Sequence, residues 1–228
     1  IHDFQVITKL PAFQDDHNDI VGWVEEKVQK SLENLKQNCL YGFLFHRPKQ
    51  LLSSNGNVLY KVLNGLKYQG LIKNIGISIY SPSELDVVVK NFDIDLVQAP
   101  VNIFDRSLEL SGAGDKLKLL GIKVHARSLF LQGLLLMDPK DRPKIFSKWE
   151  KEFDAFDYWL ASNKKTPLEV ALKYVDQLSF VDKLVVGIDS KNHLEQIIKA
   201  LSSDYIPPPI FFDNKDTRLI NPSKWNKL

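Results

Sequence analysis

The chain of 228 residues is 44% hydrophobic and 25% charged, which is typical of a globular domain with one substantial core. No apolar run approaches the roughly 20 residues that span a bilayer, and the 30 basic and 28 acidic residues are spread along the chain. We therefore expect neither a membrane nor nucleic acid as a partner. The single cysteine, Cys39, excludes an internal disulfide and has no second cysteine for a metal site, so we expect no metal and a cytoplasmic location.

Runs of strand composition alternate with segments of helical periodicity in the first half of the chain. In chain order, we expect strand 4–8, helix 19–38, strand 40–45, helix 58–68, strand 72–79 and helix 82–91. Asn18 or Asp19, both helix-capping residue types, would begin the first helix; Gly70 is placed to end the second, and Pro82 stands at the first turn of the third.

The same alternation continues in the second half. We expect strand 94–100, helix 110–120, strand 122–128, a helical region over 142–162, helix 167–175, strand 183–188 and helix 191–201, followed by a proline-rich tail. Gly112 and Gly114 weaken the helix that contains them, whereas Thr166 and Pro167 are well suited to begin a helix.

Six strand–helix alternations without hairpin signals predict βα units and a parallel sheet. A doubly wound sheet would normally carry a Gly-rich phosphate loop after its first strand, and this sequence has none. Polar residues follow most strands, as in a barrel whose active site draws one residue from each of several strands: Lys9, His46, Ser78, Gln98 and Ser128. The predicted fold class is therefore α/β, a (β/α)8 TIM barrel represented by about six βα units.

Several strand motifs resemble, in order and in spacing, those of the aldo-keto reductases. They are VITKL at 6–10, LFHRP at 44–48, GLIKNIGIS at 70–78, LVQAPVNIFDR at 96–106 and SLFLQGLL at 128–135. The tail segment LINPSKW at 219–225 is also similar to members of that family. The resemblance implies a (β/α)8 barrel that uses NADP(H) or NAD(H) to interconvert carbonyls and alcohols. It also implies that residues 1–228 form a single barrel domain with its first two units upstream of Ile1, and that residues 205–228 are a tail over the barrel.

The family's catalytic set is a tyrosine, an aspartate, a lysine and a histidine. By resemblance the lysine is Lys9 and the histidine is His46, while the tyrosine and the aspartate would lie upstream of Ile1. A phenol donates a proton near neutral pH only if a nearby cation favours its ionised form, which is the expected role of Lys9. Neutral His46 would orient the substrate carbonyl and stabilise its developing charge.

The resemblance also assigns a cofactor site. Ser78 and Gln98 would hold the nicotinamide carboxamide, although Ile79 stands where the family usually has asparagine. Arg127 replaces the usual aromatic ring beside the nicotinamide, where it would favour the neutral reduced cofactor or clamp an anionic group of the substrate.

The remaining cofactor residues fall in two segments. The first would wrap the pyrophosphate with Ser128 and backbone amides, and the second would hold the adenosine phosphate: Ser128, Leu129, Gln132 and Gly133, then Lys191, His193 and Gln196. His193 replaces the usual arginine and Ile197 the usual asparagine, so NAD(H) stays open beside NADP(H), which is the first expectation. The expected partner is a small-molecule carbonyl substrate, with an anionic group as one option.

Two other readings stay open. A lysine at the end of a barrel strand is also the nucleophile of Schiff-base aldolases, which would give Lys9 a different role. A non-catalytic barrel used for binding or regulation would explain the altered positions Ile79, Arg127 and His193.

Overall fold

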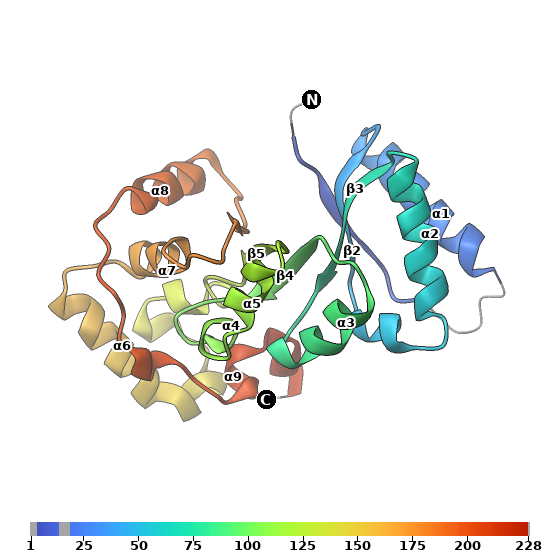
Figure 1. Ribbon diagram of the computed structural model, residues 1–228. Coiled ribbons are helices and arrows are strands. Elements are labelled where there is room, and N and C mark those ends of the chain that lie inside the picture. The colour runs from blue at the N-terminus through green and yellow to red at the C-terminus, as the bar shows by residue number, and fades with distance from the viewer. Residues whose placement is uncertain (1–3, 14–18, 228) are drawn as a thin grey trace. The chain divides into compact units, whose positions relative to one another are not determined.

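The computed structural model describes residues 4–13 and 19–227 (Figure 1). The strands are β1 (Ile7–Leu10), β2 (Leu40–Phe45), β3 (Ile72–Ser78), β4 (Leu96–Pro100), β5 (Lys123–Arg127) and β6 (Lys183–Leu184). The α-helices are α1 (Ile20–Leu35), α2 (Gly56–Tyr68), α3 (Leu85–Asn91), α4 (Ser107–Leu110), α5 (Ala113–Leu119), α6 (Glu150–Ser162), α7 (Pro167–Asp176), α8 (Lys191–Leu201) and α9 (Thr217–Ile220). Within these residues no helix is both long and apolar enough to cross a membrane.

The strands form one sheet in the order β1-β2-β3-β4-β5-β6. The pairs β1–β2, β2–β3, β3–β4 and β5–β6 are parallel, which confirms the α/β class expected from the alternation of strands and helices. In the described part of the chain β1 and β6 are the edges of this sheet, so the strands do not close into a ring.

The chain divides into two compact units. The first unit comprises residues 1–99 with 116–124, and the second comprises residues 100–115 with 125–228. Strands β4 and β5 contribute residues to both units. The expectation that residues 1–228 form a single barrel domain stays a prediction.

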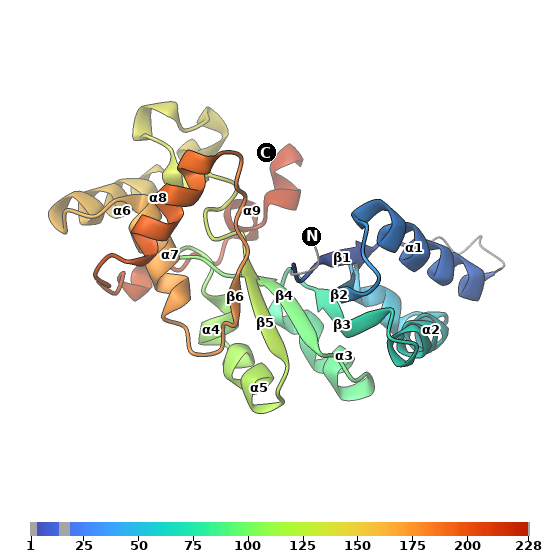
Figure 2. The same cartoon turned by 90° about the horizontal axis from the view of Figure 1, so that it is seen from above.

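In the first unit, helices α1 and α2 pack against each other and cover the same side of strands β1–β3 (Figure 2). Of the two expected capping residues, Asn18 lies outside the described residues, and the Asp19 side chain begins α1 by accepting a hydrogen bond from the Gly22 amide at 2.9 Å. Lys36 ends the helix in the left-handed region with φ of 51°. The apolar face of α1 is buried, which explains why a helix with a polar outer surface is stable here.

A glycine allows the centre of this sheet to pack closely. Gly76 of β3 pairs with Leu44 of β2 and with Leu96 of β4. A Cβ atom at Gly76 would clash with the Leu44 side chain and with the backbone carbonyl of Leu96. The motif needs glycine at this position because the neighbouring strands leave no space for a side chain.

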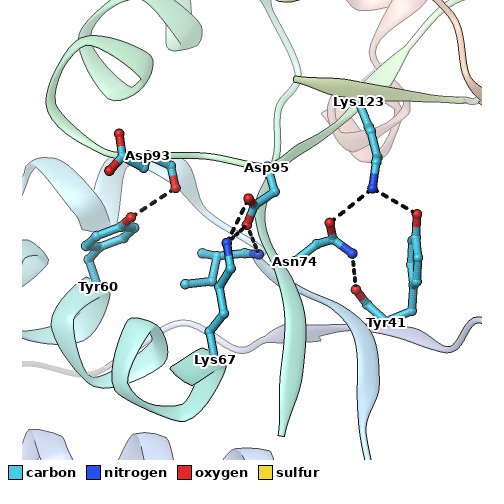
Figure 3. Close-up of polar contacts among 8 residues, drawn as sticks. Tyr41, Tyr60, Lys67, Asn74, Asp93, Asp95 and Lys123 are labelled. Carbon is cyan, nitrogen blue, oxygen red and sulfur yellow. Dashed lines mark hydrogen bonds and ion pairs between the residues drawn. The ribbon is translucent and has the colours of Figure 1, made fainter. Parts of the chain in front are cut away.

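Polar contacts tie together the amino ends of the central strands (Figure 3). The Asp95 carboxylate, just before β4, accepts the Ile75 amide at 2.7 Å and the Lys67 ammonium at 2.6 and 2.8 Å. Lys123, the first residue of β5, donates to the Asn74 amide oxygen and to the Tyr41 hydroxyl, both at 3.2 Å. These contacts satisfy polar groups at the end of the sheet opposite the expected catalytic end, where polar contacts usually serve stability.

In the second unit, helices α7 and α8 lie side by side (Figure 2). Thr166 and Glu169 form a reciprocal capping box at the start of α7, which confirms Thr166 as the residue that begins this helix. Phe212 of the tail is 4% exposed and packs among aromatic rings that include Phe104 and Phe156, whereas neighbouring Phe211 is 69% exposed. Phe212 thus anchors the tail to this unit.

Several element boundaries differ from the sequence-based expectations. The first strand runs from Ile7 to Leu10, so Lys9 lies inside it and not at its exit. The last strand is only Lys183–Leu184 and not 183–188 as expected. One further backbone hydrogen bond to β5 follows it, from the Val185 amide to the Ala126 carbonyl.

The expected helix 110–120 is two short helices, α4 and α5. Gly112, with φ of 73°, stands between them in the left-handed region, where an α-helix cannot continue. The expected helical region 142–162 begins as a 3₁₀ segment, Lys144–Trp149, and becomes α-helical only at Glu150. Other short 3₁₀ segments precede α3 and lie in the connections: Pro48–Leu52, Pro82–Glu84, Leu134–Leu136, Pro139–Asp141, Ile210–Phe212 and Pro222–Lys227.

The glycine at the centre of the sheet gives a matched pair of variants. We expect Gly76→Ala to destabilise the protein by about 1–3 kcal/mol, because the methyl group has no space beside Leu96. We expect Gly65→Ala, in the interior of α2 with no atom near the added methyl group, to stabilise it by about 0.5–1 kcal/mol. Urea unfolding measures both, and equal effects would refute the close-packing argument.

Candidate active site

The carboxyl ends of strands β1–β4 bring four expected site residues onto one face of the sheet in the first unit. Lys9 pairs in register with Leu44, and Ser78 pairs with Gln98. His46 lies two residues beyond Leu44, one step past the pair Phe45–Ile77. In-register residues of parallel strands, and residues two apart on one strand, point to the same face.

The four side chains therefore occupy two successive levels of that face. Lys9 lies on the lower level, and His46, Ser78 and Gln98 lie on the upper level, about 7 Å further along the strands. Lys9 is partly buried and His46 is exposed. This arrangement matches a site that opens at the carboxyl ends of a parallel sheet.

The backbone around His46 is fixed by the strand that precedes it. The His46 amide donates to the Leu10 carbonyl at 3.3 Å, which extends the β1–β2 ladder by one residue. Pro48 then begins a 3₁₀ segment and is buried, so the chain turns away from the sheet directly after the histidine. The LFHRP motif thus ends the strand at the point where His46 leaves it.

Ser78 and Gln98 are buried polar residues with capacity for a ligand. They are 2% and 7% exposed, and within residues 4–13 and 19–227 neither side chain makes a hydrogen bond. The polar atoms of these two side chains keep some access to solvent, so they are available to a ligand or a water molecule. A carboxamide with one donor and one acceptor group fits two neighbouring side chains of this kind.

Ile79, where the resemblance expects asparagine, is fully buried. Its amide donates to the Gln98 carbonyl at 3.0 Å, which continues the ladder between β3 and β4. The side chain contributes apolar packing and has no polar group to offer a ligand. Binding of a carboxamide here therefore depends on Ser78 and Gln98.

In the second unit, Arg127 and Ser128 stand at the carboxyl end of β5. The Arg127 carbonyl accepts a hydrogen bond from the Val101 amide at 3.0 Å. The Arg127 guanidinium donates one to the Ser128 hydroxyl at 3.1 Å. Ser128 adopts φ of 60°, in the left-handed region that few residues other than glycine enter. The backbone therefore reverses direction sharply as it leaves the strand.

The segment from Ser128 to Gly133 is an unusually wound loop. Leu131, Gln132 and Gly133 are also left-handed, with φ of 47°, 57° and 87°. Leu129 and Leu131 are almost fully buried and anchor the loop, while Gln132 is exposed. Turns of this kind can direct several backbone amides toward an anion, which fits the expected contact with a pyrophosphate.

The expected phosphate residues at the start of α8 make local contacts. The Ser190 hydroxyl caps the helix by accepting the His193 amide at 3.1 Å. The Lys191 Nζ atom lies 3.5 Å from Glu195 Oε1, and His193 Nδ1 lies 3.9 Å from Asp189 Oδ2. Lys191 and Gln196 are exposed, so this helix start is accessible to a phosphate.

The expected site residues thus fall into two sets. Lys9, His46, Ser78 and Gln98 belong to the first unit, and the residues from Arg127 onward belong to the second. The described residues contain no group of three or more His, Cys, Asp or Glu side chains that could hold a metal ion.

The sequence analysis did not single out Asn102, whose fully buried side chain donates a hydrogen bond to the Ser128 carbonyl at 3.1 Å. Its position in the VNIFDR motif, within a turn that asparagine favours, is the signal that could have identified it.

Comparison with known proteins places the chain in a family. The model of the aldo/keto reductase family matches residues 2–206. The uncharacterized oxidoreductase YqkF of Bacillus subtilis is 26% identical over 222 residues, which are 89% of this chain and 70% of that protein.

Solved structures agree on the fold. The holo form of aldo-keto reductase AKR11C1 from Bacillus halodurans superposes with a TM-score of 0.70 at 19% identity, over 91% of this chain and 68% of that one. Its apo form gives a TM-score of 0.71 at 19% identity, over 92% and 69%. At this identity the likeness shows the fold alone. Because the family model spans most of its length, the chain belongs to the aldo/keto reductase family.

Proposed function

We propose that the protein is an NAD(P)H-dependent oxidoreductase that reduces an aldehyde or a ketone to an alcohol. The observation that carries this proposal is the shared face of Lys9, His46, Ser78 and Gln98 at the carboxyl ends of β1–β4. Family membership supports the oxidoreductase class, and the reduced nicotinamide ring supplies the hydride when it is bound.

Ser78 and Gln98 would hold the cofactor carboxamide. Both side chains are buried beside each other and have no hydrogen-bond partner among the residues the structure describes. A bound carboxamide would satisfy their polar groups, and their fixed positions on two paired strands would orient the ring.

His46 and Lys9 would act on the substrate carbonyl. His46, exposed on the upper level of the face, would donate a hydrogen bond to the carbonyl oxygen, a contribution of about 3 kcal/mol to the transition state. Lys9 would favour the ionised form of the phenol that protonates the product oxygen. That phenol would be the family's tyrosine.

The second unit would hold the dinucleotide through the Ser128–Gly133 loop and the start of α8. We propose NADP(H) as the preferred cofactor, because Lys191 supplies a cationic group and His193 a ring nitrogen at an exposed helix start capped by Ser190. The substrate is a small carbonyl compound, and an anionic group on it would suit Arg127.

A non-catalytic barrel is the second candidate function. The observation that favours it is Ile79, whose buried side chain removes a polar contact that the family usually makes with the nicotinamide. Such a protein would bind NADPH without turning over any carbonyl substrate, so binding and turnover measured together distinguish the two candidates.

Cofactor binding is the first test. We expect NADPH to quench tryptophan fluorescence and raise the melting temperature, and Gln98→Leu to raise the Kd about tenfold because the buried amide is lost. Gln177→Leu, at an exposed site after α7, is the matched control and should leave the Kd unchanged. Absence of any quenching or thermal shift with the unaltered protein would contradict the proposal.

Turnover tests the catalytic pair. In a chain that includes the family's tyrosine, we expect Lys9→Met and His46→Leu each to lower kcat by about 10²–10³-fold with little change in the Kd for NADPH. Borohydride treatment with a keto substrate should leave Lys9 unmodified. A covalent adduct at Lys9 would instead identify a Schiff-base aldolase.

Arg127 gives a test of cofactor redox preference. A guanidinium stacks well on the neutral reduced ring and repels the cationic oxidised ring. We expect Arg127→Tyr to improve NADP⁺ binding relative to NADPH by about two- to fivefold, as measured by titration with both forms. If that ratio and the KM for anionic carbonyl substrates both stay the same, neither role of Arg127 is correct.

A further inference from the structure

Asn102, directly after β4, is held in one orientation by the turn that it begins. Its amide oxygen accepts the Phe104 amide at 2.9 Å and the Asp105 amide at 3.0 Å. The backbones of Asn102 and Asp105 also exchange two hydrogen bonds at 3.1 Å. Because the oxygen is fixed by these contacts, the NH₂ group of the same amide points in a defined direction.

That NH₂ group donates to the Ser128 carbonyl at 3.1 Å. The same carbonyl accepts the Leu131 amide at 3.0 Å, and the Ser128 hydroxyl accepts the Arg127 guanidinium at 3.1 Å. Ser128 is thus held by three contacts in a left-handed conformation that is unfavourable for serine. Of these three contacts, the one made by Asn102 comes from a residue outside β5 and the loop that follows it.

The C-terminal tail forms hydrogen bonds with the residues that follow Asn102. The Arg106 amide donates to the Asp213 carboxylate at 2.9 Å, and its guanidinium donates to the carbonyls of Pro208 and Pro209 at 3.0 and 2.9 Å. The Asn214 amide donates to the Phe104 carbonyl at 2.8 Å. Arg106 is 5% exposed, so these contacts are shielded from water.

We propose that Asn102 is a positioning residue for the pyrophosphate loop. Through the Ser128 carbonyl it holds the Ser128–Gly133 backbone in the conformation that directs its amides at a bound diphosphate, and the tail keeps Asn102 in place. The ligand class in this inference rests on the proposed function. In this role Asn102 touches neither cofactor nor substrate, and the tail contributes to cofactor binding through the turn that it supports.

The sharpest variant is Asn102→Asp. The acceptor oxygen that organises the turn is kept, and the donor to Ser128 is replaced by an oxygen that repels the carbonyl. Asn163→Asp is the matched control, because Asn163 also donates its amide to a backbone carbonyl, that of Trp159 at 2.8 Å, at the end of α6.

Hydrogen exchange of the protein without ligand is the first readout. We expect Asn102→Asp to speed exchange of the Leu131 and Leu134 amides about five- to tenfold, because the loop loses one anchoring hydrogen bond. Exchange in α2 should not change, and Asn163→Asp should leave the loop amides as they are. Unchanged exchange at Leu131 and Leu134 would overturn the inference.

Binding is the second readout. We expect Asn102→Asp to raise the Kd for NADPH and for 2′-phospho-ADP-ribose, which lacks the nicotinamide, by the same five- to tenfold factor. A rise for NADPH alone would place the effect at the nicotinamide and overturn the inference. If the unaltered protein binds neither ligand, the proposed function fails as well. If it binds both and the variant binds them equally well, only the inference fails.

The tail supplies a second variant should Asn102→Asp not fold. Asp213→Ala removes the acceptor for the Arg106 amide at a site on the tail. We expect it to speed exchange at the same loop amides by about two- to fivefold. Lys224→Ala, which removes an exposed contact to Thr217 further along the tail, should have no such effect.

Discussion

The parallel register of strands β1–β4 is the constraint on which the candidate site depends. Lys9, Leu44, Gly76 and Leu96 share one level across four strands, and His46, Ser78 and Gln98 share the next. A slip of one residue in any strand would turn its side chains to the opposite face. The absence of a side chain at Gly76 protects the register, because it lets β3 lie close to its two neighbours.

The two ends of the same sheet have different chemical roles. At the amino ends, the charges of Asp95 and Lys67 neutralise each other, and Lys123 is bound by neutral oxygens. At the carboxyl ends, Ser78 and Gln98 are buried without a hydrogen-bond partner among the described residues. Polar groups that satisfy one another stabilise a fold, whereas those left unsatisfied are available to a ligand.

In the second unit, an unusual backbone conformation shapes the loop from Ser128 to Gly133. Ser128, Leu131 and Gln132 all adopt left-handed conformations that are costly for residues with side chains. Asn102 holds Ser128 by a hydrogen bond, and the burial of Leu129 and Leu131 anchors the rest of the loop. A loop that is held before its ligand arrives loses less conformational entropy on binding.

The sequence by itself determined the α/β class, the parallel order of strands and the family resemblance, because hydrophobic periodicity and motif order are local properties of the chain. It predicted Lys9, His46, Ser78 and Gln98 as site residues at strand exits, since the ends of strands in a parallel sheet meet at one edge. Only the tertiary structure decided that Lys9 lies inside β1, that β6 has two residues, and that Gly112 separates α4 from α5. The contact between Asn102 and Ser128 also came from the structure alone. It joins residues 26 positions apart, and no local pattern specifies which turn will reach which loop once the chain has folded.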